Sequence, residues 1–160
     1  MREEKQWISS ENLFSAVEEL LAEGRQAVFT VTGMSMWPFL CHGRDQAVIE
    51  ACAPESLKRG DIILFRTAIG NYVLHRITGI TAEKFQTAGD GNCHYDGWFP
   101  RSCVRARAVK LIRNGKEIDC GSAVWKQIFR FWMALFPVRG ILLKIMRTGW
   151  KAVSERKKRL

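Results

Sequence analysis

Short strand-like runs separated by turn residues occupy most of the chain before residue 121. Runs rich in β-branched and aromatic residues occur at residues 27–32, 46–52, 62–65, 72–80, 85–88 and 103–112. Asn114-Gly115 is a typical two-residue hairpin turn, and it leads into a further short run at residues 116–120. Strands this short and this closely spaced predict a mainly β body of the α+β class.

Helical periodicity marks both ends of this body. Residues 10–24 carry apolar side chains at the spacing of an amphipathic helix. From residue 122 onward the apolar residues again recur every three or four positions, and Pro137 is expected to divide this segment into two helices. We therefore expect a body of residues 1–121 with an N-terminal helix, followed by a basic amphipathic helical pair at residues 122–160.

The positive charge of the chain belongs to this C-terminal segment. Residues 122–160 hold ten Lys and Arg against one Glu, which equals the net charge of +9, so residues 1–121 are balanced. Because aromatic and apolar residues alternate with the cations, we expect an anionic membrane surface as the partner and not a nucleic acid. The side carrying Trp125, Phe129, Trp132 and Phe136 would face the lipid. A groove on a protein partner and packing on the β body remain alternatives.

The cysteines and the first residues bear on the cell compartment. The five cysteines show no Cys-x-x-Cys spacing, so they predict neither a zinc site nor a disulfide framework. We expect reduced thiols, no metal and no cofactor. The first residues include acidic side chains and no long apolar core, which is unlike a signal peptide. These features favour a cytoplasmic protein that is peripheral at the membrane.

A serine, a histidine and two aspartates form a candidate site. Ser35 lies in Gly33-Met34-Ser35-Met36-Trp37-Pro38 after a strand-like run, His75 lies in a later run, and Asp90 and Asp96 lie in a polar loop at residues 89–100. A serine hydroxyl becomes a good nucleophile when a neutral imidazole takes its proton, and a carboxylate can orient that imidazole. Each residue alone is equally typical of a turn, a core histidine or a loop cap. Together they predict a Ser/His/Asp site.

Four segments in order resemble the signal peptidase I superfamily, which also contains the self-cleaving SOS-repressor peptidases. They are Gly33-Met34-Ser35-Met36-Trp37-Pro38, Arg59-Gly60-Asp61-Ile62-Ile63-Leu64-Phe65, Val73-Leu74-His75-Arg76-Ile77 and Thr87-Ala88-Gly89-Asp90-Gly91-Asn92. The resemblance is to the archaeal and endoplasmic-reticulum type, which has a histidine where the bacterial enzymes have a lysine. No run of about 20 apolar residues corresponds to the N-terminal membrane-spanning helix of true signal peptidases.

This resemblance implies a complex β fold of the signal-peptidase type and a role for each site residue. Ser35 would be the nucleophile, His75 the general base and Asp96 the supporting acid, with Asp90 structural or assisting. The backbone N–H groups of Ser35 and of its neighbour Met36 would stabilise the oxyanion.

We therefore expect a serine endopeptidase that cleaves a peptide or protein precursor. One alternative is a non-catalytic peptide-binding or membrane-adaptor module on the same fold. Another is a self-cleaving regulator, although only about 26 residues precede the first expected strand, too few for a helix-turn-helix domain with a cleavable linker.

Overall fold

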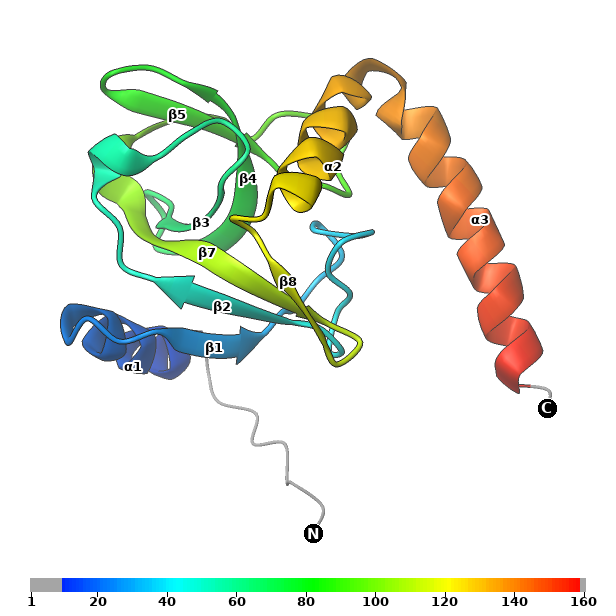
Figure 1. The fold of residues 1–160 in the computed structure, drawn as a ribbon, viewed down its shortest axis with the longest axis horizontal. Coiled ribbons are helices and arrows are strands. Elements are labelled where there is room, and N and C mark those ends of the chain that lie inside the picture. The colour runs from blue at the N-terminus through cyan, green and yellow to red at the C-terminus, as the bar shows by residue number, and fades with distance from the viewer. Residues whose placement is uncertain (1–9, 159–160) are drawn as a thin grey trace, which may run out of the picture.

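A computed structural model describes the backbone of residues 10–158 and the side chains of residues 13–150 (Figure 1). Its elements in chain order are α1 (Ser10–Ala22), β1 (Ala27–Thr30), β2 (Gln46–Glu50), a 3-10 turn (Pro54–Ser56), β3 (Ile62–Arg66), β4 (Tyr72–Ile80), β5 (Lys84–Ala88), β6 (Gly97–Pro100), a 3-10 turn (Arg101–Cys103), β7 (Val104–Arg113), β8 (Lys116–Asp119), α2 (Ala123–Ala134), a 3-10 turn (Phe136–Val138) and α3 (Arg139–Lys158).

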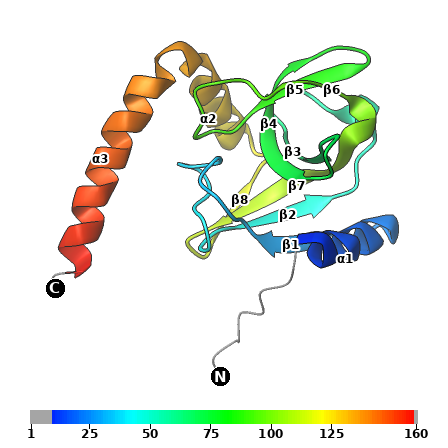
Figure 2. The ribbon, with the colours of Figure 1, turned by 180° about the vertical axis from the view of Figure 1, so that it is seen from behind.

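The strands form one antiparallel sheet. Its order is β1-β2-β7-β3-β4-β5-β6, and β8 pairs with β7 outside this path. The sheet curves strongly, with α1 at the β1 end and α2 beside β4 and β8 (Figures 1 and 2). The prediction of a mainly β, α+β class is confirmed.

Local turn signals are where the sequence prediction is most accurate. Asn114 and Gly115 both have positive φ, 52° and 77°, as a tight hairpin between β7 and β8 requires. Pro137 lies in the 3-10 turn that separates α2 from α3, as expected. The prediction that residues 89–100 are loop throughout is wrong, because Gly97–Pro100 form β6 and pair with β5.

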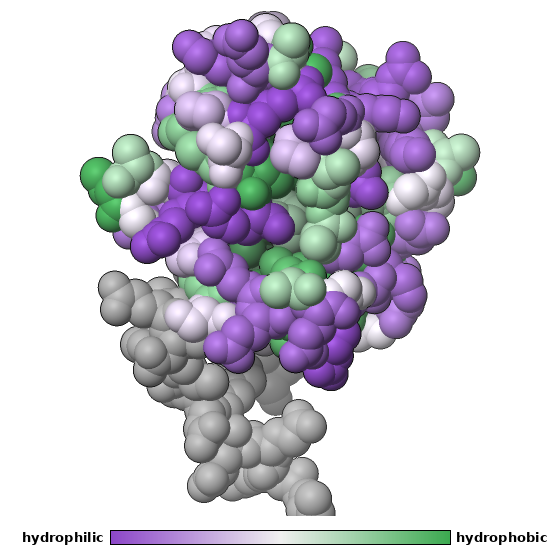
Figure 3. Space-filling model, turned by 90° about the vertical axis from the view of Figure 1, so that its left-hand side faces the viewer, coloured by the Kyte–Doolittle hydropathy of each residue, from purple (hydrophilic) through white to green (hydrophobic). Residues whose placement is uncertain are grey.

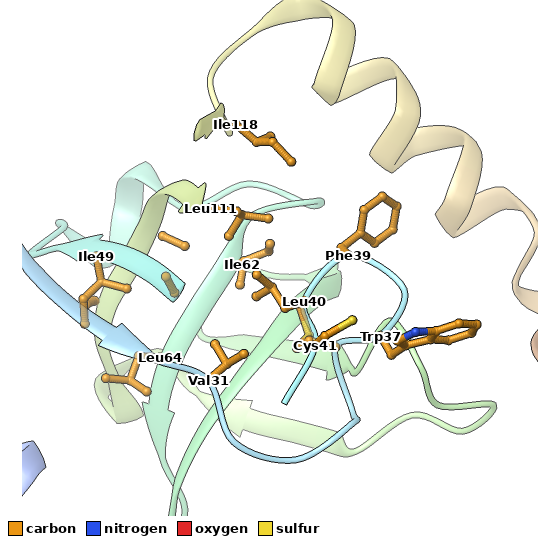
Figure 4. Close-up of a cluster of buried hydrophobic side chains, with 14 of the residues drawn as sticks. Val31, Trp37, Phe39, Leu40, Cys41, Ile49, Ile62, Leu64, Leu111 and Ile118 are labelled. Atoms are coloured by element: carbon orange, nitrogen blue, oxygen red, sulfur yellow. The ribbon is translucent and has the colours of Figure 1, made fainter. Parts of the chain in front are cut away.

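Strand β3 contributes to the core on both of its faces. Ile62 and Leu64 belong to a large cluster between the sheet, α1, the segment 31–41 and the C-terminal helices, whereas Ile63 and Phe65 pack with Ile77 and Phe85 in a second cluster. Figure 4 shows Leu40, Ile62 and Leu111 close together in the large cluster, with Trp37 directed away from them toward α3. Residues of both halves of the chain therefore share one core.

The aromatic side of α2 packs on the β body. Phe129 and Trp132 are only 4% and 7% exposed, and their rings meet the Phe39 ring edge-on at 5.2 and 5.7 Å. This corrects the expectation that this side faces lipid, since the sheet and the segment after β1 occupy it. Leu143 of α3 also belongs to the large cluster. The C-terminal helices are thus part of the same hydrophobic core as the sheet.

Polar surface surrounds this core on the side seen in Figure 3, where hydrophobic residues show mainly in a central recess. Within residues 10–158, no helix combines the length and the apolar character needed to cross a bilayer. All five cysteines are free in the structure.

Asp45 fixes the end of the serine loop, which we define as residues 31–45 between β1 and β2. Its buried carboxylate accepts hydrogen bonds from the N–H groups of Cys41 (2.8 Å) and Asn114 (3.0 Å) and from the Arg44 guanidinium (2.7 and 2.8 Å). Burial acts to raise the pKa of Asp45, but these hydrogen bonds outweigh it and hold the pKa below its usual value. Asp45 thereby ties the serine loop to the β7–β8 turn.

We expect Asp45→Asn to lower the free energy of unfolding by about 1–3 kcal/mol at neutral pH, because a charged acceptor of several donors is lost. The folded-state pKa lies below that of the unfolded chain, so the carboxylate stabilises the fold above about pH 4. This contribution disappears as the pH falls through the folded-state pKa. Urea unfolding of both proteins should therefore give stabilities that converge on acidification, and a difference that stays constant down to low pH would contradict this role.

Candidate active site

Ser35 lies in a compact part of the serine loop in which most of the side chains that follow it are buried. Met36, Trp37 and Leu40 are buried in the core, and the Leu40 N–H donates to the Met36 carbonyl oxygen at 2.9 Å. Ser35 itself is half-buried, and its carbonyl oxygen accepts a hydrogen bond from the Gly91 N–H at 2.7 Å. The apolar neighbours therefore hold the loop against the core while the serine stays at the surface of a pocket.

His75 lies on β4 and contacts Asp96 through its Nδ1 atom. Nδ1 and the Asp96 Oδ2 are 2.6 Å apart, and the Thr87 hydroxyl donates to the same Oδ2 at 2.8 Å. An ionised carboxylate can only accept, so Nδ1 carries the hydrogen and Nε2 of the neutral ring is free to accept a proton. The arrangement leaves Nε2 as the basic nitrogen.

Ser35 and His75 line the same cavity, of about 250 Å³. Its other walls are largely apolar and come from α1, β1, β3 and β4; they include Phe14, Phe29, Leu64, Tyr72 and Leu74. Phe14 of α1 stacks on Tyr72 with ring centroids 4.1 Å apart, and the Tyr72 hydroxyl donates to Glu18 at 2.7 Å. An extended apolar group could thus lie next to the two polar residues.

Glycines allow the loop after β5 to approach Ser35 and His75 closely. A Cβ atom on residue 89 would clash with the Ser35 carbonyl oxygen and would come within 3.1 Å of the His75 Nε2. A Cβ on residue 91 would lie 2.6 Å from the Met34 carbonyl oxygen. The Nε2 side of the imidazole therefore faces the backbone around Ser35.

Asp90 is in a different place from Asp96. Its carboxylate accepts two hydrogen bonds from Arg76, from Nε at 2.8 Å and from Nη2 at 2.7 Å, and both side chains are 1% exposed. The remaining Arg76 Nη1 donates to the Gly60 carbonyl oxygen at 2.8 Å, and the guanidinium lies 4.0 Å from the Phe129 ring centroid. Asp90 therefore anchors the loop and does not contact His75.

The two C-terminal helices donate to three consecutive carbonyl groups of this loop. The Arg139 Nη1 donates to Gly89 at 3.5 Å, the Trp132 Nε1 to Asp90 at 3.1 Å and the Arg147 Nη2 to Gly91 at 2.8 Å. Burial of the Arg139 guanidinium lowers its pKa from the usual value. The segment that contacts Ser35 is thus held from the opposite side by α2 and α3.

The backbone around Ser35 offers donors to a ligand. Across residues 10–158, the N–H groups of Ser35 and Met36 make no hydrogen bond. Two adjacent free N–H groups are the kind of donor pair that an oxyanion requires. We found no group of three or more His, Cys, Asp or Glu side chains suited to a metal ion in this part of the chain.

The structure thus brings together Ser35, His75 and Asp96 of the predicted residues, whereas Asp90 pairs with Arg76. Sequence reasoning missed Arg76 and Asp45. An arginine inside an apolar strand and an aspartate directly before one are the signals that could have indicated buried ionic partners.

No protein-family model matches the chain, and no curated protein sequence matches it. We therefore infer its function from the geometry of the site together with the resemblance seen in the sequence.

We expect Gly89→Ala to disturb the site, because the added methyl group cannot fit against the Ser35 carbonyl without a shift of the backbone. The thermal midpoint should fall by several degrees, since such overpacking typically costs about 1–3 kcal/mol. Gly149→Ala is the matched control, because nothing lies within 4 Å of its added Cβ on α3 and alanine favours a helix. Equal midpoints for wild type and Gly89→Ala would show that the close approach does not constrain the loop.

Proposed function

We propose that the protein is a serine endopeptidase that cleaves a peptide or protein precursor, with Ser35 as nucleophile, His75 as general base and Asp96 as the residue that orients the imidazole. The observation that carries the proposal is the 2.6 Å contact of His75 Nδ1 with Asp96, which leaves Nε2 as the basic nitrogen of a histidine that lines the same cavity as Ser35. Met36 would contribute its backbone N–H to the oxyanion site. The sequence resemblance to the signal peptidase I superfamily, which implies a complex β fold of that type, supports the same assignment.

In the proposed reaction the Ser35 Oγ attacks the carbonyl carbon of the scissile peptide bond while its proton passes to the His75 Nε2. The N–H groups of Ser35 and Met36 stabilise the negative oxygen, a contribution of about 3–4 kcal/mol for each donor. The proton on Nε2 then passes to the leaving amine as the C–N bond breaks, which leaves an ester on Ser35. A water molecule deprotonated by His75 hydrolyses this ester and restores the serine.

A fluorophosphonate probe tests the activation of Ser35. Intact-mass spectrometry should show one adduct on the wild type and none on Ser35→Ala, whereas Ser102→Ala, which removes an exposed hydroxyl elsewhere, should label normally. Asp96→Asn should slow labelling by about 10²- to 10⁴-fold, because an amide can donate to Nδ1 and would leave the hydrogen on Nε2. Thermal midpoints near that of wild type would establish that Ser35→Ala is folded.

Equal labelling of Ser35→Ala would rule out this nucleophile. Tight binding of peptides with neither labelling nor cleavage by the wild type would favour the non-catalytic peptide-binding module.

The labelling rate should also depend on pH. Histidines as a class change charge between about pH 5 and 8, and a protonated imidazole cannot accept the Ser35 proton. We expect the rate to fall as the pH is lowered through this range, with the fold retained by circular dichroism. A flat profile would exclude a histidine as the base.

The hydrogen bond from α3 to the loop after β5 gives a further expectation. Arg147→Met removes the donor to the Gly91 carbonyl, and Lys144→Met removes an exposed cation on the same helix that makes no such contact. We expect Arg147→Met alone to speed hydrogen exchange of the Gly91 amide and to slow probe labelling by several-fold, since both depend on the position of this loop. Indistinguishable behaviour of the two variants would show that Arg147 does not position the loop.

A further inference from the structure

The outer side of α2 carries an apolar ridge, which we define as Val124, Ile128 and Phe131. These residues lie at positions i, i+4 and i+7 of the helix, so their side chains follow one line along its surface. They are 68%, 37% and 65% exposed, although the neighbouring aromatic side of the same helix is buried. Helix α2 is therefore apolar on two sides, and the β body covers only one of them.

Helix α3 repeats this arrangement. Its inner side packs on the body through Leu143, while Val138 just before the helix and Ile141 and Ile145 on it are 51%, 69% and 65% exposed. Figure 1 shows α3 running along the edge of the molecule, away from the sheet. A second apolar stripe is thus presented outward by the same helical pair.

Exposed cations accompany both stripes. Arg130 and Phe131 of α2 line one surface hollow together with Arg59 of the turn before β3. Lys126 lies on the opposite side of the helix from the ridge, in a hollow that it shares with Lys58 and Asp61. Lys144 is exposed on α3. Helix α2 contains no acidic residue, and α3 contains seven Lys and Arg against one Glu.

We propose that the outer sides of α2 and α3 dock on an anionic lipid surface. Narrow apolar stripes flanked by lysine and arginine are typical of helices that lie at a membrane interface, whereas the core of a protein–protein interface is depleted in lysine. The charge is complementary to anionic lipid, because residues 122–160 hold ten Lys and Arg against one Glu, and Arg130 and Lys144 are exposed although Arg139 is buried. Phe131 and the isoleucines enter the headgroup boundary, and the cations contact lipid phosphates.

Point variants test this better than truncation, because deletion after Gly121 would remove Phe129, Trp132 and Leu143 from the core. We would measure flotation of the full chain with phosphatidylcholine vesicles and with vesicles that also contain phosphatidylglycerol. The wild type should bind the anionic vesicles at low salt, bind the neutral ones weakly, and dissociate as salt is added. Replacing Arg130 and Lys144 by glutamine should weaken binding about thirtyfold, at about 1 kcal/mol for each near-surface charge.

Glutamate at Ile128 and Phe131, and separately at Ile141 and Ile145, should also weaken binding at least about tenfold. The matched controls are Ile69→Glu, an 84% exposed isoleucine in the β3–β4 turn, and Lys116→Gln in β8; both should bind like wild type. Absence of binding to anionic vesicles at low salt, or equal loss in the controls, would overturn the proposal. So would a dimer in light scattering that Phe131→Glu dissociates while vesicles are ignored, since the ridge would then contact a second copy. None of these readouts depends on catalysis by Ser35.

Discussion

The buried ion pair between Arg76 and Asp90 is the interaction on which the candidate site depends. Moving two charges out of water costs several kcal/mol for each ion, and this cost is offset only when geometry and hydrogen bonding are nearly complete. Here both Asp90 oxygens and all three Arg76 nitrogens have partners, and the guanidinium lies over the Phe129 ring. Loss of either partner would leave the other charge buried and unpaired. The pair therefore joins β4, the turn before β3, the loop after β5 and α2 around the residue that precedes Arg76, which is His75.

This arrangement makes the C-terminal helices part of the support of the site. One side of the loop after β5 contacts Ser35 through a backbone hydrogen bond. On the other side, its carbonyl oxygens accept hydrogen bonds from Trp132, Arg139 and Arg147. Arg139 is as fully buried as Arg76, so one of the basic residues that the sequence counts with the charge of residues 122–160 is structural. The charge that remains exposed on α2 and α3 is smaller than the sequence implies, and part of it, at Arg130 and Lys144, lies near the uncovered apolar stripes.

Local signals explain what the sequence could predict. The Asn114-Gly115 hairpin, the division of the last helices at Pro137 and the alternating strands each depend on a few adjacent residues, and the structure agrees with all of them. Strand β6 was missed because it has only four residues and follows a run of Gly, Asp and Asn that is typical of loops. The residue pattern alone also does not distinguish Asp90 from Asp96, and only the family resemblance indicated Asp96 as the supporting acid, because two aspartates of one loop differ only in which distant strand residue each contacts. Asp90 pairs with Arg76 and Asp96 pairs with His75, and these pairings depend on the tertiary structure.

Tertiary contacts that local patterns do not specify also explain why the prediction that the aromatic side of α2 faces lipid was wrong. Periodicity identifies a helix with aromatic residues at every third or fourth position, but it does not say whether a sheet or a membrane covers them. The helix has two apolar sides about a third of a turn apart, and the β body has room for one of them. Phe129 and Trp132 take that place, where both rings pack against Phe39 and lie under the guanidinium groups of Arg76 and Arg139 respectively. Val124, Ile128 and Phe131 are left exposed, and Arg130 lies beside Phe131 on a helix that has no acidic residue. Exposing an apolar surface of this kind to water has a free-energy cost, and the contact with anionic lipid that we propose would remove that cost while it pairs the cations with lipid phosphates.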